Sequence, residues 1–271
     1  MARLRTRTPT LCFESVRPDW HPRLPEFAAA ANAVSLMMPY VEPFVVRAVR
    51  SELSALDGEL AEQARRYAEQ ESRHHTQHRH FNERLSGTVR GVGVLTRAME
   101  WTFRGLSRWG SPRFHMAYST ASEALAYGLA RWVERHHHEL FDGADPDAAR
   151  LYLWHLAEEV EHKQVAVDVY DERYGSRAAL MCALAFTTVL LALFATAGTV
   201  VGLVHLGRRV RPSMLWNLCR WGTGFVFTEL PNMFVALLPG HRPADFVDPT
   251  WYAVFLAGLE AAPVRGAVPT P

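Results

Sequence analysis

Apolar residues recur at helical spacing through the first 175 positions, and no segment alternates polar and apolar residues as a half-buried strand would. After an irregular lead-in over residues 1–25, the pattern predicts helices over 26–51, 57–85, 89–109, 112–139 and 147–170. Pro39 and Pro43 lie inside the first predicted helix, where proline should kink or split it. We therefore expect an all-α bundle over residues 26–175.

The remainder, residues 176–271, reads as a hydrophobic and aromatic helical extension with a tail. Residues 178–204 contain no charged side chain, and this run of 27 residues is long enough to cross a bilayer. Its threonines and glycines lower its hydrophobicity, so one or two buried helices fit equally well. Such helices would pack on the bundle, line a lipophilic channel or form a homodimer interface. Association with the cytoplasmic membrane surface is a third interpretation, between a membrane-spanning helix and buried helices.

Composition excludes some functions. The chain has 271 residues, enough for one large domain or a domain with an extension. Its net charge of +1 gives no basic footprint for nucleic acid, so no nucleic-acid partner is expected. The three cysteines form no Cys-x-x-Cys pair, which argues against a disulfide framework and a thiolate zinc site. The basic N-terminus lacks the apolar core of a secretory signal, and a cytoplasmic location is expected.

The chemistry comes from two Glu-x-x-His pairs, Glu71/His74 in the second predicted helix and Glu159/His162 in the fifth. Residues three apart lie side by side on a helix, so each pair can present a carboxylate and an imidazole to one metal ion. Glu158 lies one turn before His162 and could replace Glu159, although the three-residue spacing favours Glu159.

Two single glutamates complete the pattern. Glu42 and Glu123 lie on apolar segments of the first and fourth predicted helices, where an unpaired carboxylate is costly to bury. Glu100 on the third helix competes with Glu123 for this role. The order Glu, Glu-x-x-His, Glu, Glu-x-x-His is that of a ferritin-like dinuclear carboxylate centre. We therefore expect two metal ions, iron first and manganese second.

The chain resembles a bacterial family catalogued as predicted metal-dependent hydrolases, near the ferritin-like di-iron enzymes. The resemblance lies in residues 70–74, His78, residues 81–82 and 111–113, and above all in residues 154–163 and 165–170. It implies that Glu42, Glu71, His74, Glu123, Glu159 and His162 are the metal ligands. It adds His78 as an extra ligand and His155 as a supporting residue or spare ligand. Family members often carry histidine where this chain has Ala124, so the resemblance is not used to infer a substrate.

Three functions remain. The ligand chemistry favours an oxygen-activating oxidase or oxygenase, with dioxygen and a small, lipophilic molecule as substrates. The family description favours hydrolysis by a metal-bound water, with Glu158 as a general base that does not bind metal. A non-catalytic metal-binding or storage protein is the third reading, since related bundles serve several functions.

Overall fold

The computed structural model describes residues 4–261, except for the side chains of Arg208, Glu260 and Ala261, and these residues form helices and no strand. The helices are α1 (Pro25–Glu52), α2 (Gly58–Thr88), α3 (Val92–Trp109), α4 (Pro112–Glu134), α5 (His137–Phe141), α6 (Pro146–His162), α7 (Val165–Arg173), α8 (Arg177–Leu206), α9 (Pro212–Thr228), α10 (Leu230–Ala236) and α11 (Thr250–Ala261). Single 3-10 turns form η1 (Leu53–Ala55), η2 (Gly207–Arg209) and η3 (Pro243–Asp245). The all-α fold class is confirmed.

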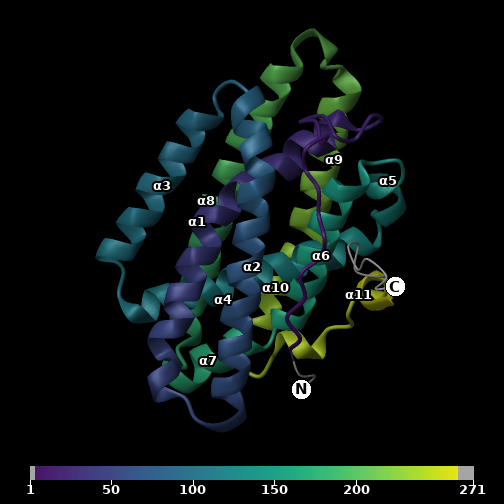
Figure 1. The fold of residues 1–271 in the computed structure, drawn as a ribbon. Helices are drawn as coiled ribbons and strands as arrows, with labels where there is room; N and C mark the ends of the chain where they lie inside the picture. Colours follow the sequence, from purple (N-terminus) through teal and green to yellow (C-terminus); the bar gives the residue numbers. More distant parts are fainter. Residues whose placement is uncertain (1–3, 262–271) are drawn as a thin grey trace, which may run out of the picture.

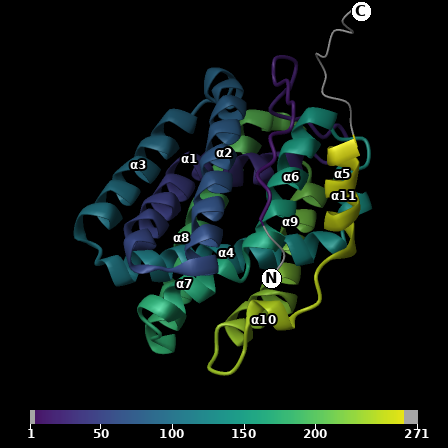
Figure 2. The ribbon, with the colours of Figure 1, turned by 60° about the horizontal axis from the view of Figure 1, so that its bottom comes forward.

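Four helices form the centre of the molecule. Helix α1 packs against α2 and α4, and α6 packs against the same two helices from the other side (Figures 1 and 2). The four therefore enclose a common interior. Outside them, α3 and α8 lie against α1, and α11 lies against α6. Glu42, Glu123 and both Glu-x-x-His pairs lie on these four helices, whereas Glu100 lies on α3.

The starts of α4 and α6 are fixed by residues suited to that position. Ser111 accepts a hydrogen bond from the backbone N–H of Phe114, and Pro112 supplies the first helical residue. Asp145 accepts hydrogen bonds from the N–H groups of Asp147 and Ala148. These caps set the register of the two helices that carry Glu123, Glu159 and His162.

The prolines of α1 do not split it, because α1 continues through Pro39 and Pro43. Proline has no N–H, so Pro39 leaves the carbonyl of Ser35 without its helical partner. The side-chain amide of Asn82 on α2 donates to that carbonyl at 2.8 Å. The lost helical bond is thus replaced from the neighbouring helix, and this replacement makes an unbroken α1 tolerable.

Two other predicted helices are shorter than expected. The fourth ends at Glu134, and α5 follows as a separate turn. The fifth is interrupted between α6, which ends at His162, and α7, which begins at Val165. The interruption lies directly after the last expected ligand.

The apolar run after residue 177 forms one long helix, α8, that packs along α1 and α4. Gly198 and Gly202 allow its backbone to approach α1 closely. A Cβ atom on Gly198 would lie 2.6 Å from the Cβ of Ala33, and one on Gly202 would lie 2.7 Å from that of Ala29. Small residues thus determine this contact. The division of the chain at residue 175 into a bundle and an extension stays a prediction.

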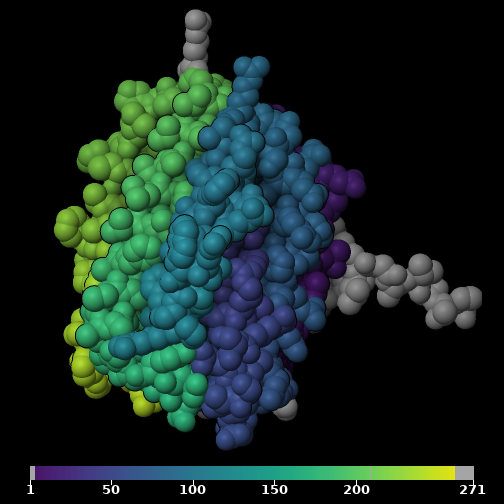
Figure 3. All heavy atoms as spheres, turned by 90° about the vertical axis from the view of Figure 1, so that its left-hand side faces the viewer, coloured from purple at the N-terminus to yellow at the C-terminus, as the bar shows by residue number. Residues whose placement is uncertain are grey.

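By length and composition, α1 with η1 (Pro25–Ala55) and α8 could each cross a membrane. In α1 67% of the most apolar window is buried, which is ordinary for a core helix, whereas in α8 only 22% is buried. Val189, Leu193, Val200 and Val204 form an exposed apolar stripe along α8. Figure 3 shows α8 in green beside α3 in blue on one face of the molecule.

Candidate metal centre

The six expected ligands converge in the interior of the four central helices. Helix α1 contributes Glu42 and α4 contributes Glu123, while α2 and α6 each contribute one Glu-x-x-His pair. All six side chains are at most 3% exposed, although each could be charged. Burial of this many ionisable groups is costly unless they bind one another or a cation. The residues are Glu42, Glu71, His74, Glu123, Glu159 and His162.

The ligand atoms fall into overlapping groups. Glu71, Glu123, Glu159 and His162 form one group in which the atoms lie within 4.8 Å of one another. A second group unites Glu42 with Glu71 and His74, and a third unites His74 with Glu159 and His155. Glu71 belongs to both the first and the second group, and Glu159 belongs to both the first and the third. The groups therefore share Glu71 and Glu159, and each offers a set of ligand atoms that could hold a metal ion.

The histidines of the two pairs are placed alike. His162 Nδ1 lies 3.0 Å from Glu71 Oε1, 3.4 Å from Glu123 Oε2 and 3.6 Å from Glu159 Oε2. His74 Nδ1 lies 3.4 Å from both Glu71 Oε1 and Glu159 Oε1. Each Nδ1 atom therefore points into a set of carboxylate oxygens. This is the geometry in which an imidazole and several carboxylates share one cation.

The hydrogen-bond inventory of these atoms tests the fit to a metal. Neither oxygen of Glu42 has a hydrogen-bond partner, nor do Glu71 Oε1, Glu123 Oε2 and the Nδ1 atoms of His74 and His162. Buried polar atoms without a partner are rare and require an explanation such as an ion. Two divalent cations would balance the four carboxylates and bind every one of these atoms. The donor set therefore fits a dinuclear centre.

The Nε2 atoms of His74 and His162, which face away from the carboxylate cluster, each have a hydrogen-bond partner. His74 Nε2 lies 3.0 Å from Glu158 Oε2, and His162 Nε2 lies 3.1 Å from Gln70 Oε1. Metal-binding histidines almost always donate their second N–H to such an acceptor, which fixes the ring and its tautomer. Glu158 therefore lies behind His74, outside the ligand cluster. This position gives it a task that competes with the general-base role expected from the sequence.

The N-terminal segment closes the same side of the site. Both terminal nitrogens of Arg7 donate to Glu161, at 3.0 and 3.1 Å, and one of them lies 3.5 Å from Glu158. Gln70 donates to Glu161 at 3.2 Å. Lys163 and Arg150 are the basic residues nearest to Glu158 and Glu161 along the chain. Arg7 is the cation observed beside both, while Lys163 binds Asp248.

Charge interactions within the cluster shift the pKa values apart. Burial and the nearby Glu71 raise the pKa of Glu42 well above its ordinary value, and burial and Glu159 do the same for Glu123. Burial opposes ionisation of Glu159, but the nearby charge of His162 outweighs it and holds its pKa well below the ordinary value. Without metal, the cluster therefore binds protons unequally.

Burial alone would lower the pKa values of the two pair histidines. Hydrogen bonding of His74 to Glu158 and the charge of Glu159 beside His162 reverse this, so both pKa values are raised well above the ordinary one. A bound cation would have to displace these protons, because only the deprotonated Nδ1 can bind metal.

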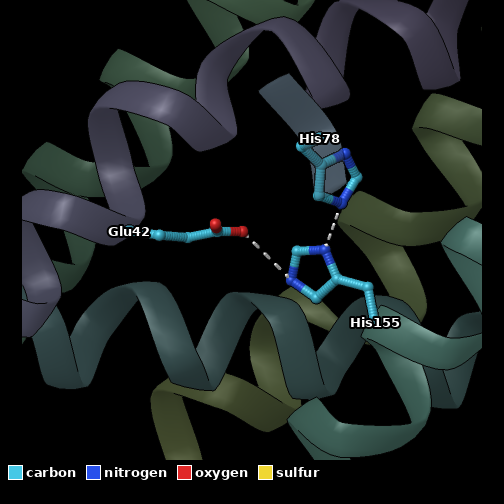
Figure 4. Close-up of side chains that lie close together, drawn as sticks. All are labelled: Glu42, His78 and His155. Carbon is cyan, nitrogen blue, oxygen red and sulfur yellow. Dashed lines mark hydrogen bonds and ion pairs between the residues drawn. The ribbon is translucent and has the colours of Figure 1, made fainter. Parts of the chain in front are cut away.

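His78 and His155 lie at the edge of the same cluster. His155 Nε2 lies 2.9 Å from Glu159 Oε1 and 3.6 Å from Glu42 Oε1, and His155 Nδ1 lies 2.7 Å from His78 Nε2 (Figure 4). Burial lowers the pKa of both histidines. His78, His155 and Glu42 also form a group whose ligand atoms lie within 4.8 Å of one another, and of the two histidines His155 contacts the carboxylates directly.

Other candidate residues lie elsewhere. Glu100, the competitor of Glu123, pairs with Arg104 on the outer helix α3. His75 is half-buried, His80 is exposed, and His138 pairs with Asp142 at the surface. The three cysteines are free and exposed. None of these residues belongs to the cluster of ligand atoms.

The supporting residues Gln70, Arg7, Ser35 and Asn82 were not assigned roles from the sequence. Their side chains carry no metal-ligand signature, and only their packing reveals them. The spacing of Gln70, directly before Glu71, was the one available hint.

Comparison with known proteins identifies the family of the chain. No curated protein and no solved structure matches the chain. The family model described as "Predicted metal-dependent hydrolase" matches residues 5–246, nearly the whole chain and every residue of the cluster. The chain therefore belongs to the predicted metal-dependent hydrolase family.

Proposed function

We propose that this protein is an enzyme that holds two divalent cations, iron first and manganese second, between α1, α2, α4 and α6. The convergence of four buried glutamates and two unpartnered histidine Nδ1 atoms carries the proposal. One Glu from each of two helices and a Glu-x-x-His pair from each of two others is the ligand pattern of ferritin-like di-iron and di-manganese proteins. Oxygen and nitrogen donors without thiolate fit those metals.

Oxygen activation is the reaction we favour. Ferrous ions bound there would supply electrons to dioxygen, whereas redox-inert ions would acidify water for hydrolysis. The chain's own contribution is to exclude solvent and fix the ligands, since all six are buried. Glu42 is the least restrained of them, because neither of its oxygens has a hydrogen-bond partner and its nearest charged contact, His155 Nε2, lies 3.6 Å away. It is therefore the carboxylate that can move most easily when a substrate enters.

Hydrolysis is the second candidate, and the description of the family supports it. It requires a carboxylate that can accept a proton from water. Glu158 was the expected base, but its position behind His74 supports a positioning role. Glu42 lies inside the cluster and has no hydrogen-bond partner, so it is the better-placed acceptor if hydrolysis is the reaction.

Elemental analysis of the freshly purified chain tests the metal centre. We expect about two ions per chain, and Glu71→Ala and His162→Ala should each lose most of the metal. Glu83→Ala, an exposed position on α2, is the matched control and should retain it. An equal metal content in all four proteins would contradict the proposal.

The reaction is tested on the metal-loaded chain. Consumption of dioxygen after anaerobic loading with ferrous iron, with iron oxidised in pairs, supports oxygen activation. Ester or phosphoester cleavage with zinc or manganese under strict anaerobiosis supports hydrolysis instead. Uptake of many irons per chain without an organic product would contradict both and indicate storage.

A lipophilic substrate is part of the proposal. A hollow between α1, α2, α3 and α8 is lined mainly by apolar residues, among them Ala29, Leu36, Leu85, Val92, Val201 and Leu206. The lining suits an alkyl chain, and because its free volume of about 20 Å³ holds only about one water molecule, the hollow must widen for such a chain to enter. Long-chain fatty acids should therefore raise the melting temperature of the metal-loaded protein, and Val201→Trp, which fills the hollow, should abolish the effect. Equal stabilisation by small polar acids would contradict this.

A further inference from the structure

Beside the six ligands, four side chains form a hydrogen-bonded series that ends at the metal centre. The series runs from Asn82 through Ser35 and His78 to His155, and all four are at most 9% exposed. We call it the Asn82–His155 series. The direction in which its protons are donated determines which atom His155 presents to the carboxylates.

The backbone of α1 fixes the first member. Pro39 leaves the carbonyl of Ser35 free, and Asn82 Nδ2 donates to it at 2.8 Å. A carbonyl oxygen can only accept, so the amide orientation of Asn82 is determined. Its Oδ1 therefore faces Ser35 Oγ, at 2.7 Å, and must accept the hydroxyl proton.

The remaining protons follow in order. The single hydroxyl proton of Ser35 is used, so its oxygen can only accept from His78 Nδ1, which lies 2.8 Å away. His78 Nδ1 consequently carries a proton. In neutral His78, Nε2 then has a lone pair and accepts from His155 Nδ1–H at 2.7 Å. Both nitrogens of His78 are thus occupied, and the ring is not available as a ligand.

The last atom of the series is His155 Nε2. In neutral imidazole with a proton on Nδ1, Nε2 carries a lone pair. That atom lies 2.9 Å from Glu159 Oε1 and 3.6 Å from Glu42 Oε1 (Figure 4). A lone pair facing two carboxylates is repulsive unless a proton or a metal cation lies among them. This is the observation that selects His155.

We propose that His155 is a third histidine ligand of the dinuclear centre and that it binds the ion shared by Glu42 and His74 through Nε2. The inference rests on the proposed metal centre. It makes the two ion positions unequal, since one has two imidazoles and the other has only His162. The position with more nitrogen should bind late divalent transition metals more tightly and fill first.

The protonation state of the rings tests this directly. The full chain is labelled with ¹⁵N-histidine and loaded with Zn²⁺, which is diamagnetic. Long-range ¹H–¹⁵N spectra should show His155 with a proton on Nδ1 and a metal-bound Nε2 without one. His78 should show a proton on Nδ1 and a hydrogen-bonded Nε2. A proton on His155 Nε2 in protein that binds two zinc ions would overturn the inference and leave the metal centre standing. Failure to bind zinc would overturn both.

Variants give a second measurement, with Co²⁺ as the probe. His155→Gln should weaken the tighter ion by at least about tenfold and change the visible ligand-field bands. His78→Gln should change affinity less, because it removes only the residue that orients His155. His80→Gln, an exposed histidine of the same helix α2, is the matched control. Unchanged affinity and spectrum in His155→Gln would overturn the inference.

Discussion

Each histidine of the metal centre has two ring nitrogens, and the structure gives them different tasks. One nitrogen faces the carboxylates, and the other is held by a supporting side chain, as in His74 with Glu158. The supporting residue does not touch the cation, so its loss should loosen the ligand without removing it.

We therefore expect Glu158→Gln to lower metal affinity by about 10- to 100-fold while the protein still binds two ions per chain. Competition with a chromophoric chelator measures the affinity. Glu83→Gln is the control, because Glu83 is exposed on α2. A variant that binds both ions as tightly as the wild type would show that Glu158 does not position His74.

Metal binding at these residues should also release protons from the cluster. The pKa values of Glu42, Glu123, His74 and His162 are raised, so these groups retain protons at pH values where they would ordinarily lose them. A bound cation must displace those protons, and metal affinity should fall as the pH falls. Near pH 7, calorimetric titration in buffers of different ionisation enthalpy should show at least about one proton released per ion. Binding heats that do not depend on the buffer would contradict this.

At this scale the six candidate ligands could be selected from sequence because glutamate and histidine three residues apart have few other reasons to be buried. The structure brings the six together, and their metal binding stays a prediction. Ser35 and Asn82 could not be selected, since serine and asparagine are common on helices. Only the missing N–H of Pro39 gives Asn82 its importance, and that depends on which helix packs beside α1.

At the scale of elements, sequence patterns gave helix positions better than helix ends. The interruption after His162 was missed because residues 147–170 keep helical periodicity through Lys163 and Gln164. Continuity of α1 was missed for the opposite reason, since the effect of Pro39 is compensated by a residue of another helix. Tertiary contacts decided both cases.

The contact between α8 and α1 makes a prediction about stability. Gly198→Ala would place a Cβ 2.6 Å from that of Ala33 and should lower the free energy of unfolding by about 1–3 kcal/mol. Gly222 in α9 has no atom within 4 Å of its Cβ position. Gly222→Ala should therefore raise stability by up to about 1 kcal/mol, from helix propensity alone. Urea unfolding of the two variants measures the difference, and equal effects would contradict the proposed close contact.

At the scale of the whole molecule, the exposed stripe on α8 is the feature that most needs a partner. Helix α3, which packs against α8, exposes Trp101 and Trp109, which are 75% and 82% exposed, together with the exposed Arg97 and Arg108. Tryptophan and arginine beside an apolar stripe are typical of a surface that lies on anionic lipid. We propose membrane-surface association as the role of this face.

Liposome flotation tests this association. The wild type should float with vesicles that contain phosphatidylglycerol and float less with pure phosphatidylcholine. Leu193→Asp should reduce flotation, whereas Val247→Asp, an exposed position outside this face, should not. A dimer in solution that Leu193→Asp dissociates, without any flotation, would identify the stripe as a self-association interface instead.

The glycine contact also determines how far the outer face lies from the chemistry. Only the methyl groups of Ala33 and Ala29 separate α8 from α1 at Gly198 and Gly202, and the carboxylate of Glu42 on α1 belongs to the buried cluster. Because the two helices are closely packed there, a tilt or slide of α8 should displace α1 as well. The outer wall of the protein and its buried carboxylate cluster are therefore separated by the thickness of a single helix.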